Sequence, residues 1–274
     1  MYKYEHGGDI YTEKTTADGK PLVDFSANIN PLGLPLGVKE AMKAAIKECG
    51  NYPDPFCRKL REATAAYLNV KPEYLFFGNG ASDLLFRLAV ALKPTRGMVY
   101  APTFADYAKA LRAVKCNVRN YYLLEENDFL PTKNIVGKMT TRTDIFVICN
   151  PNNPTGQITS RAVIERMLQK CRVINCKLLV DECFMDFVAP EKAFSVRDLL
   201  EEYPELIILK AFTKTFAMPG VRLGYLMCSD MELHEKLYQS GQDWSVSVLA
   251  QAAGIAALKE QEYLHESMML VQEE

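Results

Sequence analysis

The stretch LIILKAFTKTFAMPGVRLGYLMC, residues 206–228, indicates most directly how this chain folds. It contains two short apolar runs, LIILK at 206–210 and RLGYLMC at 222–228, on either side of a loop that carries Lys214. Unbroken apolar runs of this length are typical of strands that are buried on both faces of a sheet. The stretch therefore predicts two buried strands, joined by a loop with a lysine in it.

Similar apolar runs precede this stretch along the chain. They are YLFFG (74–78), MVYA (98–101), IFVIC (145–149) and KLLVD (177–181). Amphipathic segments with helical spacing lie between several of them, such as SDLLFRLAVALK (82–93) and SRAVIERMLQKCRV (160–173). This alternation predicts an α/β fold with a mainly parallel central sheet covered by helices. Ligands of such sheets bind beyond the carboxyl ends of the strands, so the residues after each run are candidates for a site.

Length and composition set the class of protein. The 274 residues can form one large domain and the start of a second, and contents of 49% hydrophobic and 24% charged residues are typical of a soluble globular protein. The net charge of −2 offers no basic surface to nucleic acid or to an anionic membrane, and no apolar run is long enough to cross a bilayer. The N-terminal sequence lacks the apolar stretch of a signal peptide, so we expect a cytoplasmic protein.

The cysteines and histidines do not suggest a metal site. None of the eight cysteines forms a CxxC pair, and the three histidines, His6, His234 and His265, are far apart in sequence. We expect reduced, buried cysteines, as is usual in cytosolic proteins, and no bound metal.

Polar motifs follow three of the predicted strands. After YLFFG, residues Gly80, Ala81 and Ser82 form a glycine turn that opens a helix, where backbone N–H groups could hold a phosphate, although most such turns are only turns. IFVIC is followed by NPNNPTG (150–156), which is either a tight turn or a ligand loop. KLLVD ends in Asp181, whose carboxylate needs a cationic partner at the edge of a buried strand, such as a protonated heterocyclic nitrogen.

Lys214 and Arg222 each have two interpretations. A lysine in an apolar loop loses its proton readily and can act as an amine nucleophile. The common alternative is a solvated surface lysine, and Arg222 could equally be an ordinary ion-pair residue. The residue types alone leave both interpretations open.

Four motifs in a fixed order resemble the pyridoxal-phosphate (PLP) aminotransferase superfamily of fold type I. They are NPNNPTG (150–156), VDE (180–182), FTK (212–214) and PGVRLGY (219–225), and the resemblance extends over nearly the whole chain. It implies a large domain like that of aspartate aminotransferase. Residues 1–35 would form an N-terminal arm, 36–240 the PLP-binding large domain, and 241–274 the start of a linker helix, with the C-terminal small domain largely absent.

The resemblance also implies roles at single positions. Lys214 resembles the lysine that holds PLP as a Schiff base and later moves protons, and Asp181 resembles the carboxylate that pairs with the pyridinium nitrogen. Tyr52 resembles the tyrosine that reaches the cofactor of a neighbouring subunit, which requires a homodimer. The other implied cofactor contacts are Asn153 at the ring's 3-oxygen, Phe104 stacked on the ring, and Gly80, Ala81, Ser82, Thr213 and Arg222 around the phosphate.

Two branches of this superfamily share these motifs, the threonine-phosphate decarboxylases of cobalamin biosynthesis and the histidinol-phosphate aminotransferases. The segments HGGD (6–9), DFSANINPLG (24–33) and DWSVSVLAQAA (243–253) are similar to the decarboxylase branch. That branch converts L-threonine O-3-phosphate to (R)-1-amino-2-propanol O-2-phosphate. Phe184 stands where the aminotransferases usually place a tyrosine. His6 and Asn30 resemble arm residues that approach the substrate, although a turn or surface role is about as common for each.

Two features depart from the family pattern. Ala211 stands where relatives usually carry a hydroxyl that helps to bind the cofactor phosphate. The sequence stops at EYLHESMMLVQEE (262–274), before the small domain that normally supplies an arginine for the substrate's α-carboxylate. We therefore expect either part of a working enzyme, which we favour, or a short protein that binds PLP or dimerises without turnover.

Overall fold

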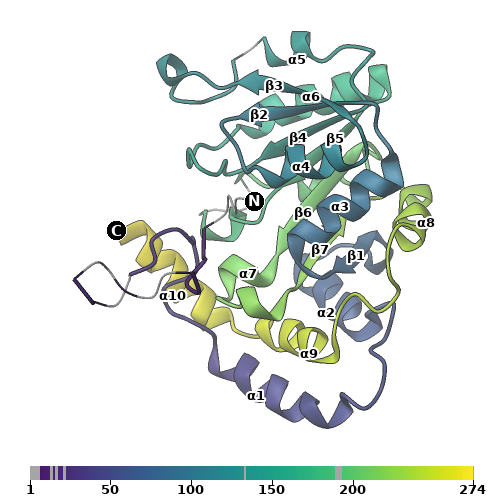
Figure 1. Ribbon diagram of the computed structural model, residues 1–274. Helices are drawn as coiled ribbons and strands as arrows, with labels where there is room; N and C mark the ends of the chain where they lie inside the picture. The colour runs from purple at the N-terminus through teal and green to yellow at the C-terminus, as the bar shows by residue number, and fades with distance from the viewer. Residues whose placement is uncertain are drawn as a thin grey trace.

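The computed structural model describes residues 7–12, 15, 18–20, 23–132, 134–188 and 193–273 (Figure 1). Within these ranges, seven strands form one sheet in the order β1-β7-β6-β5-β4-β2-β3. The strands are β1 (Leu75–Gly78), β2 (Arg96–Ala101), β3 (Asn117–Tyr122), β4 (Ile145–Cys149), β5 (Lys177–Asp181), β6 (Leu206–Ala211) and β7 (Gly224–Met227). Strands β3, β2, β4, β5 and β6 are parallel, whereas β7 runs antiparallel to both β6 and β1. The predicted mainly parallel sheet is confirmed.

Ten α-helices lie in the described part of the chain. They are α1 (Leu36–Ala45), α2 (Arg58–Leu68), α3 (Gly80–Leu92), α4 (Asp106–Ala113), α5 (Ile135–Lys138), α6 (Arg161–Ile174), α7 (Phe212–Thr215), α8 (Met231–Gln239), α9 (Val248–Ala257) and α10 (Gln261–Glu273). Among the described residues, no helix is both long enough and apolar enough to span a membrane. Helix α1 begins directly after the arm predicted at 1–35, and the proposed domain limits remain predictions.

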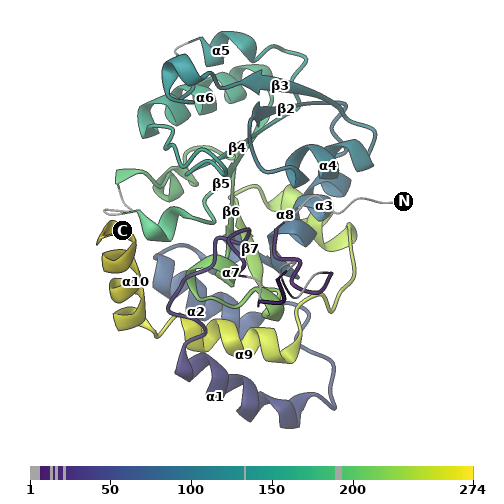
Figure 2. The same cartoon turned by 60° about the vertical axis from the view of Figure 1, so that its left-hand side comes forward.

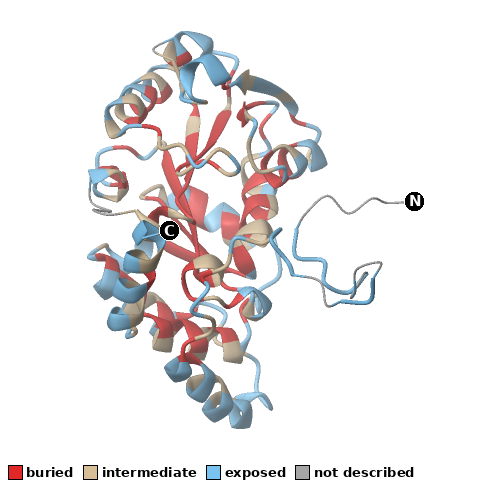
Figure 3. Ribbon diagram, turned by 90° about the vertical axis from the view of Figure 1, so that its left-hand side faces the viewer, coloured by how far each residue is buried: buried red, intermediate tan, exposed pale blue. Residues whose placement is uncertain are grey.

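Helices cover both faces of the sheet (Figure 2). Side chains of α2, α6 and α9 pack on one face, and those of α3, α4 and α8 pack on the other. Successive residues of a strand point to opposite faces, so Ile208 belongs to the first layer while Ile207 and Leu209 belong to the second. The central strands β4 and β6 are consequently buried throughout (Figure 3), which explains why they are mostly apolar, with Lys210 of β6 as the exception.

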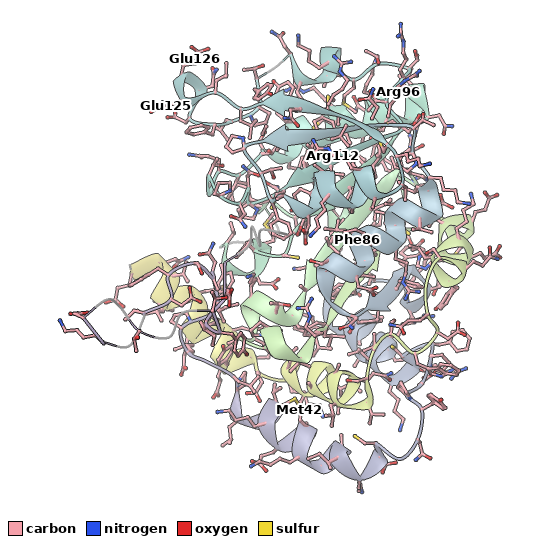
Figure 4. All side chains as sticks on the ribbon, viewed as in Figure 1. Met42, Phe86, Arg96, Arg112, Glu125 and Glu126 are labelled. Carbon is pink, nitrogen blue, oxygen red and sulfur yellow. The ribbon has the colours of Figure 1, made fainter. Side chains whose placement is uncertain are left out.

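Strand β3 escaped the sequence analysis. Its residues NVRNYY are mostly exposed, with only Val118 and Tyr121 half-buried, because β3 is the edge strand next to β2. Charged side chains crowd this end of the molecule, where Glu125 and Glu126 lie exposed beyond β3 (Figure 4). Polar edges of this kind discourage pairing with another chain. An edge strand with polar residues lacks the apolar run by which the others were found.

Gly254 marks the closest approach of α9 to the layer beneath it. A Cβ atom built at Gly254 would lie 2.6 Å from Leu223 Cδ2 and 2.8 Å from Leu60 Cδ1, and both leucines are fully buried. Glycine therefore permits a helix-to-core distance that any larger residue would widen.

We expect Gly254→Val to lower the free energy of unfolding by about 1–3 kcal/mol, because the added methyl groups overpack a filled layer. Chemical denaturation of the variant and the parent measures this loss. Gly137→Ala in α5 is the matched control, since a Cβ there meets nothing within 4 Å. Equal losses in the two variants would contradict the packing explanation.

Candidate active site

The carboxyl ends of β4, β5 and β6 meet at one edge of the sheet. Cys149 pairs with Asp181, and Asp181 pairs with Leu209, so the loops after these strands start side by side. The loop after β6 continues at once into the short helix α7, which contains Lys214. The topology thus brings together the motif NPNNPTG, Asp181 and the loop that carries Lys214, which the sequence places at the ends of these three strands.

Asp181 is a buried carboxylate with two hydrogen-bond donors. It is only 5% exposed; the Tyr107 hydroxyl donates to Oδ2 at 2.7 Å, and the backbone N–H of Cys183 donates to Oδ1 at 2.9 Å. Burial raises the pKa of Asp181, while these hydrogen bonds and the nearby Lys214 oppose that rise. A cation placed against this carboxylate would stabilise its ionised form, as a protonated ring nitrogen does.

Lys214 is a half-buried amine at the same edge. Burial lowers its pKa, and the positive charge of Arg222 lowers it further, whereas Cys183 and Asp181 act in the opposite direction. Its Nζ atom lies 5.9 Å from the centre of the Phe184 ring. An amine with a lowered pKa has a larger neutral fraction at neutral pH, and the neutral form is the nucleophile.

The turn that opens α3 is shaped for an anion. Gly80 has φ +81°, and a Cβ built there would lie 2.6 Å from Nη2 of Arg222, so only glycine allows the guanidinium to pack against this turn. Gly224 is equally constrained, because its Cβ would lie 2.9 Å from the backbone nitrogen of Ala81. A guanidinium beside the N-terminus of a 13-residue helix fits a phosphate group.

Two other residues predicted around the phosphate are placed in this neighbourhood. The Ser82 hydroxyl donates to Asp106 Oδ2 at 2.9 Å, so it is oriented by a carboxylate on α4. Thr213 precedes Lys214 within α7, and its carbonyl accepts the backbone N–H of Met218 at 3.2 Å. Their expected phosphate contacts stay predictions.

The asparagines of NPNNPTG divide into two kinds. Asn150 is fully buried and forms two hydrogen bonds with the backbone of Thr159. The N–H of Thr159 donates to Asn150 Oδ1 at 2.8 Å, and Asn150 Nδ2 donates to the carbonyl of Thr159 at 3.3 Å. Asn152 is also buried, and its amide binds the carbonyl of Pro102 at 3.1 Å and the Thr155 hydroxyl at 3.0 Å. Both therefore hold the loop in shape. Asn153 instead lines a cleft of about 370 Å³ beside the strand ends, with Asn30, Pro151, Phe184, Phe187 and Val271.

Phe104 and Tyr107 form an aromatic pair next to Asp181. Their ring centres are 5.5 Å apart with planes at 78°, an edge-to-face contact. Phe104 was singled out from the sequence, but Tyr107 was not. Tyr107 lies in the first turn of α4, where an aromatic residue is normally a core residue. Nothing in the local sequence shows that its hydroxyl contacts a carboxylate from β5.

The remaining predicted residues lie elsewhere or are already engaged. Tyr52 is 78% exposed and stacks on Trp244 with ring centres 4.5 Å apart, away from the residues above. Asn30 is only 3% exposed and donates its amide to Thr215 O and to Ser267 Oγ. His6 lies outside the described residues. Across the ranges that the structure describes, no group of three or more His, Cys, Asp and Glu side chains could hold a metal ion.

The residues gathered here fit pyridoxal 5′-phosphate. Its phosphate, its ring nitrogen and its aldehyde need an anion cradle, a buried carboxylate and an amine with a lowered pKa. Arg222 at the glycine turn suits the phosphate, Asp181 suits the ring nitrogen, and Lys214 suits the aldehyde.

Comparison with known proteins gives the same family. The sequence model of class I and II aminotransferases matches residues 20–274. The threonine-phosphate decarboxylase of Salmonella typhimurium is 36% identical over 262 residues, which cover 95% of this chain and 71% of that protein.

Solved structures confirm the predicted aspartate aminotransferase-like fold. The histidinol-phosphate aminotransferase from Clostridium acetobutylicum superposes with a TM-score of 0.84 and 30% identity, covering 90% of this chain and 73% of that one. A double mutant of the aspartate aminotransferase from Thermus thermophilus gives 0.81 with 26% identity, covering 90% and 67%. The chain belongs to the class I and II aminotransferases, a family of enzymes that use pyridoxal 5′-phosphate.

Proposed function

We propose that this chain carries out the decarboxylation of L-threonine O-3-phosphate to (R)-1-amino-2-propanol O-2-phosphate with pyridoxal 5′-phosphate at the site described above. The observation that carries the proposal is the buried Asp181 carboxylate, with its two donors, at the same strand ends as the amine of Lys214. The choice of substrate is supported by the 36% identity to a protein named threonine-phosphate decarboxylase.

Each residue then has a chemical task. When bound, the cofactor supplies an electron sink for the pair left on Cα as a bond to that carbon breaks. Asp181, whose ionised form the hydrogen bonds from Tyr107 and Cys183 favour against the effect of burial, would keep the ring nitrogen protonated. Lys214 would hold the cofactor through Nζ and would carry the proton that Cα needs once the carboxylate has left.

Binding residues fix the orientation on which the reaction depends. The phosphate would be held by Arg222, the turn Gly80–Ser82 and Thr213. Asn153 would donate a hydrogen bond to the ring oxygen, and Phe104 would stack on the ring. Tyr52 would extend from a second copy of the chain toward the phosphate, and its 78% exposure leaves it available for that contact. The residues that orient the substrate would therefore decide between loss of CO2 and loss of a proton from Cα.

A histidinol-phosphate-type aminotransferase is the second candidate. It is supported by the structural likeness to the enzyme from Clostridium acetobutylicum, with 30% identity over 90% of this chain. Both reactions use the same cofactor contacts, and they differ in which bond to Cα is broken.

The two candidates predict different products. We expect the PLP-loaded protein to release CO2 from L-threonine O-3-phosphate in step with formation of the phosphorylated amino alcohol, and to act more slowly on L-threonine, which lacks the phosphate. Carbon-13 NMR of carboxyl-labelled substrate follows the CO2, and phosphorus-31 NMR follows the phosphorylated amino alcohol. Formation of a keto acid from an amino donor without CO2 would support the aminotransferase instead.

Lys214→Ala should abolish covalent attachment of the cofactor and lower turnover by at least ~10²-fold, because a positioned proton carrier alone contributes that much. Borohydride reduction of the loaded protein followed by peptide mass spectrometry should find the label on Lys214. Lys236→Ala on α8, whose side chain is exposed, is the control and should leave the label in place. A label on another lysine would exclude the assigned role.

Tyr107→Phe should shift the acidic limb of the pH–rate profile to higher pH. The Tyr107 hydroxyl donates to the ionised carboxylate and so lowers the pKa of Asp181; without this bond the carboxylate takes up a proton at a higher pH. Tyr100→Phe is the control, because that buried hydroxyl meets Thr159 and not Asp181. An unshifted limb in Tyr107→Phe would show that Asp181 does not set it.

A further inference from the structure

The helix that carries Lys214 ends with carbonyl groups that the helix itself cannot satisfy. Helix α7 has only four residues, Phe212–Thr215, and the last carbonyls of any helix lack intrahelical donors. The carbonyl of Lys214 accepts the backbone N–H of Ala217 at 3.4 Å, and the N-terminal arm supplies further donors to Lys214 and Thr215. The backbone N–H of Asn30 donates to Lys214 O at 3.2 Å, and the side-chain Nδ2 of Asn30 donates to Thr215 O at 2.8 Å.

The same side chain also joins α10 to this helix. Its Nδ2 donates a second hydrogen bond to Ser267 Oγ at 2.7 Å, and its Oδ1 accepts the N–H of Leu32 at 3.1 Å. Asn30, Thr215 and Ser267 are 3%, 2% and 2% exposed. Three segments far apart in the sequence therefore meet at one buried amide, which we call the Asn30 clamp (Asn30, Thr215 and Ser267).

On its other side α7 is held by an acidic residue. The Thr215 hydroxyl donates to Asp186 Oδ2 at 2.8 Å, and Asp186 forms an ion pair with the buried Lys210 at the end of β6. Thr215 at the end of α7 is therefore held from two sides, by Asp186, which also pairs with Lys210 of β6, and by the Asn30 clamp from the arm and α10.

We propose that Asn30 is a positioning residue for Lys214, acting through the backbone of α7 and tying the orientation of the amine to α10. The proposal rests on the role of Lys214 put forward under Proposed function. Both amide hydrogens of Asn30 are already used within the clamp, so the side chain orients the lysine turn and has no donor left for a substrate. Asparagine suits this task because its NH2 group has two N–H donors. One donates to the carbonyl of Thr215 and the other to the hydroxyl of Ser267.

The first test needs no cofactor. In the apo-protein we expect Asn30→Ala and Ser267→Ala to speed amide hydrogen exchange of the peptide spanning 212–218, by about tenfold for Asn30→Ala. Asn30→Ala leaves the buried carbonyl of Thr215 without its side-chain donor, and Ser267→Ala leaves one N–H of the Asn30 amide without its acceptor, so local opening becomes easier. Asn30→Asp should do the same or more, because a carboxylate cannot donate to a carbonyl. Glu266→Ala, an exposed neighbour of Ser267 on α10, is the control and should leave the exchange unchanged.

The second test follows the amine itself. In the loaded protein, the visible absorption of the cofactor attached to Lys214 changes at a midpoint pH that depends on how the amine is oriented. We expect Asn30→Ala and Ser267→Ala to displace this midpoint, whereas Glu266→Ala leaves it in place. A double variant of Asn30 and Ser267 should match Asn30→Ala alone, because Ser267 acts only through the asparagine.

The outcomes separate the proposal from its premise. Faster exchange in the clamp variants with a displaced midpoint supports the positioning role. Faster exchange with an undisplaced midpoint, or additive effects in the double variant, would show that Asn30 only packs the fold and would overturn the proposal. If the parent protein takes up no cofactor on Lys214, the proposed function fails, while unchanged exchange in Asn30→Ala would independently refute the clamp.

Discussion

The site depends on one buried negative charge. Asp181 ends β5, a strand whose neighbours on both sides are apolar, and burial makes its ionised form costly. The chain offsets that cost with the Tyr107 hydroxyl and the Cys183 N–H, and it places a lysine with a lowered pKa rather than a fixed cation at the same edge. The carboxylate is thus left to attract a positive charge that comes with a ligand, which is the property that the proposed cofactor site needs.

Much of this fold could be predicted because its central strands are covered on both faces. Burial on two sides favours apolar residues on both faces of a strand, and that leaves continuous apolar runs in the sequence for β4, β5 and β6. The edge strand β3 has no such constraint and was missed. The antiparallel direction of β7 could not be predicted either, since an apolar run carries no information about its direction.

The site divides along similar lines. Lys214, Asp181, Asn153 and Arg222 lie in motifs whose order along the chain resembles a known family, so their neighbourhood could be predicted. Tyr107 could not be predicted, because its hydroxyl gains its meaning only from a carboxylate 74 residues away. In the motif NPNNPTG, most of the asparagines stabilise the loop itself. Asn150 and Asn152 form hydrogen bonds that hold its shape, and Asn153 lines the cleft.

The antiparallel placement of β7 has a consequence for how the site holds together. Because β7 runs back along β6, its first residues return to the edge where β6 ended, and Lys214 and Arg222 belong to a single β-α-β hairpin within 206–228. A ligand that contacts both residues bridges the two ends of one contiguous segment. The binding energy of such a ligand would oppose a single local opening reaction, so the hairpin and the ligand would form one cooperative unit whose stability rises with ligand concentration.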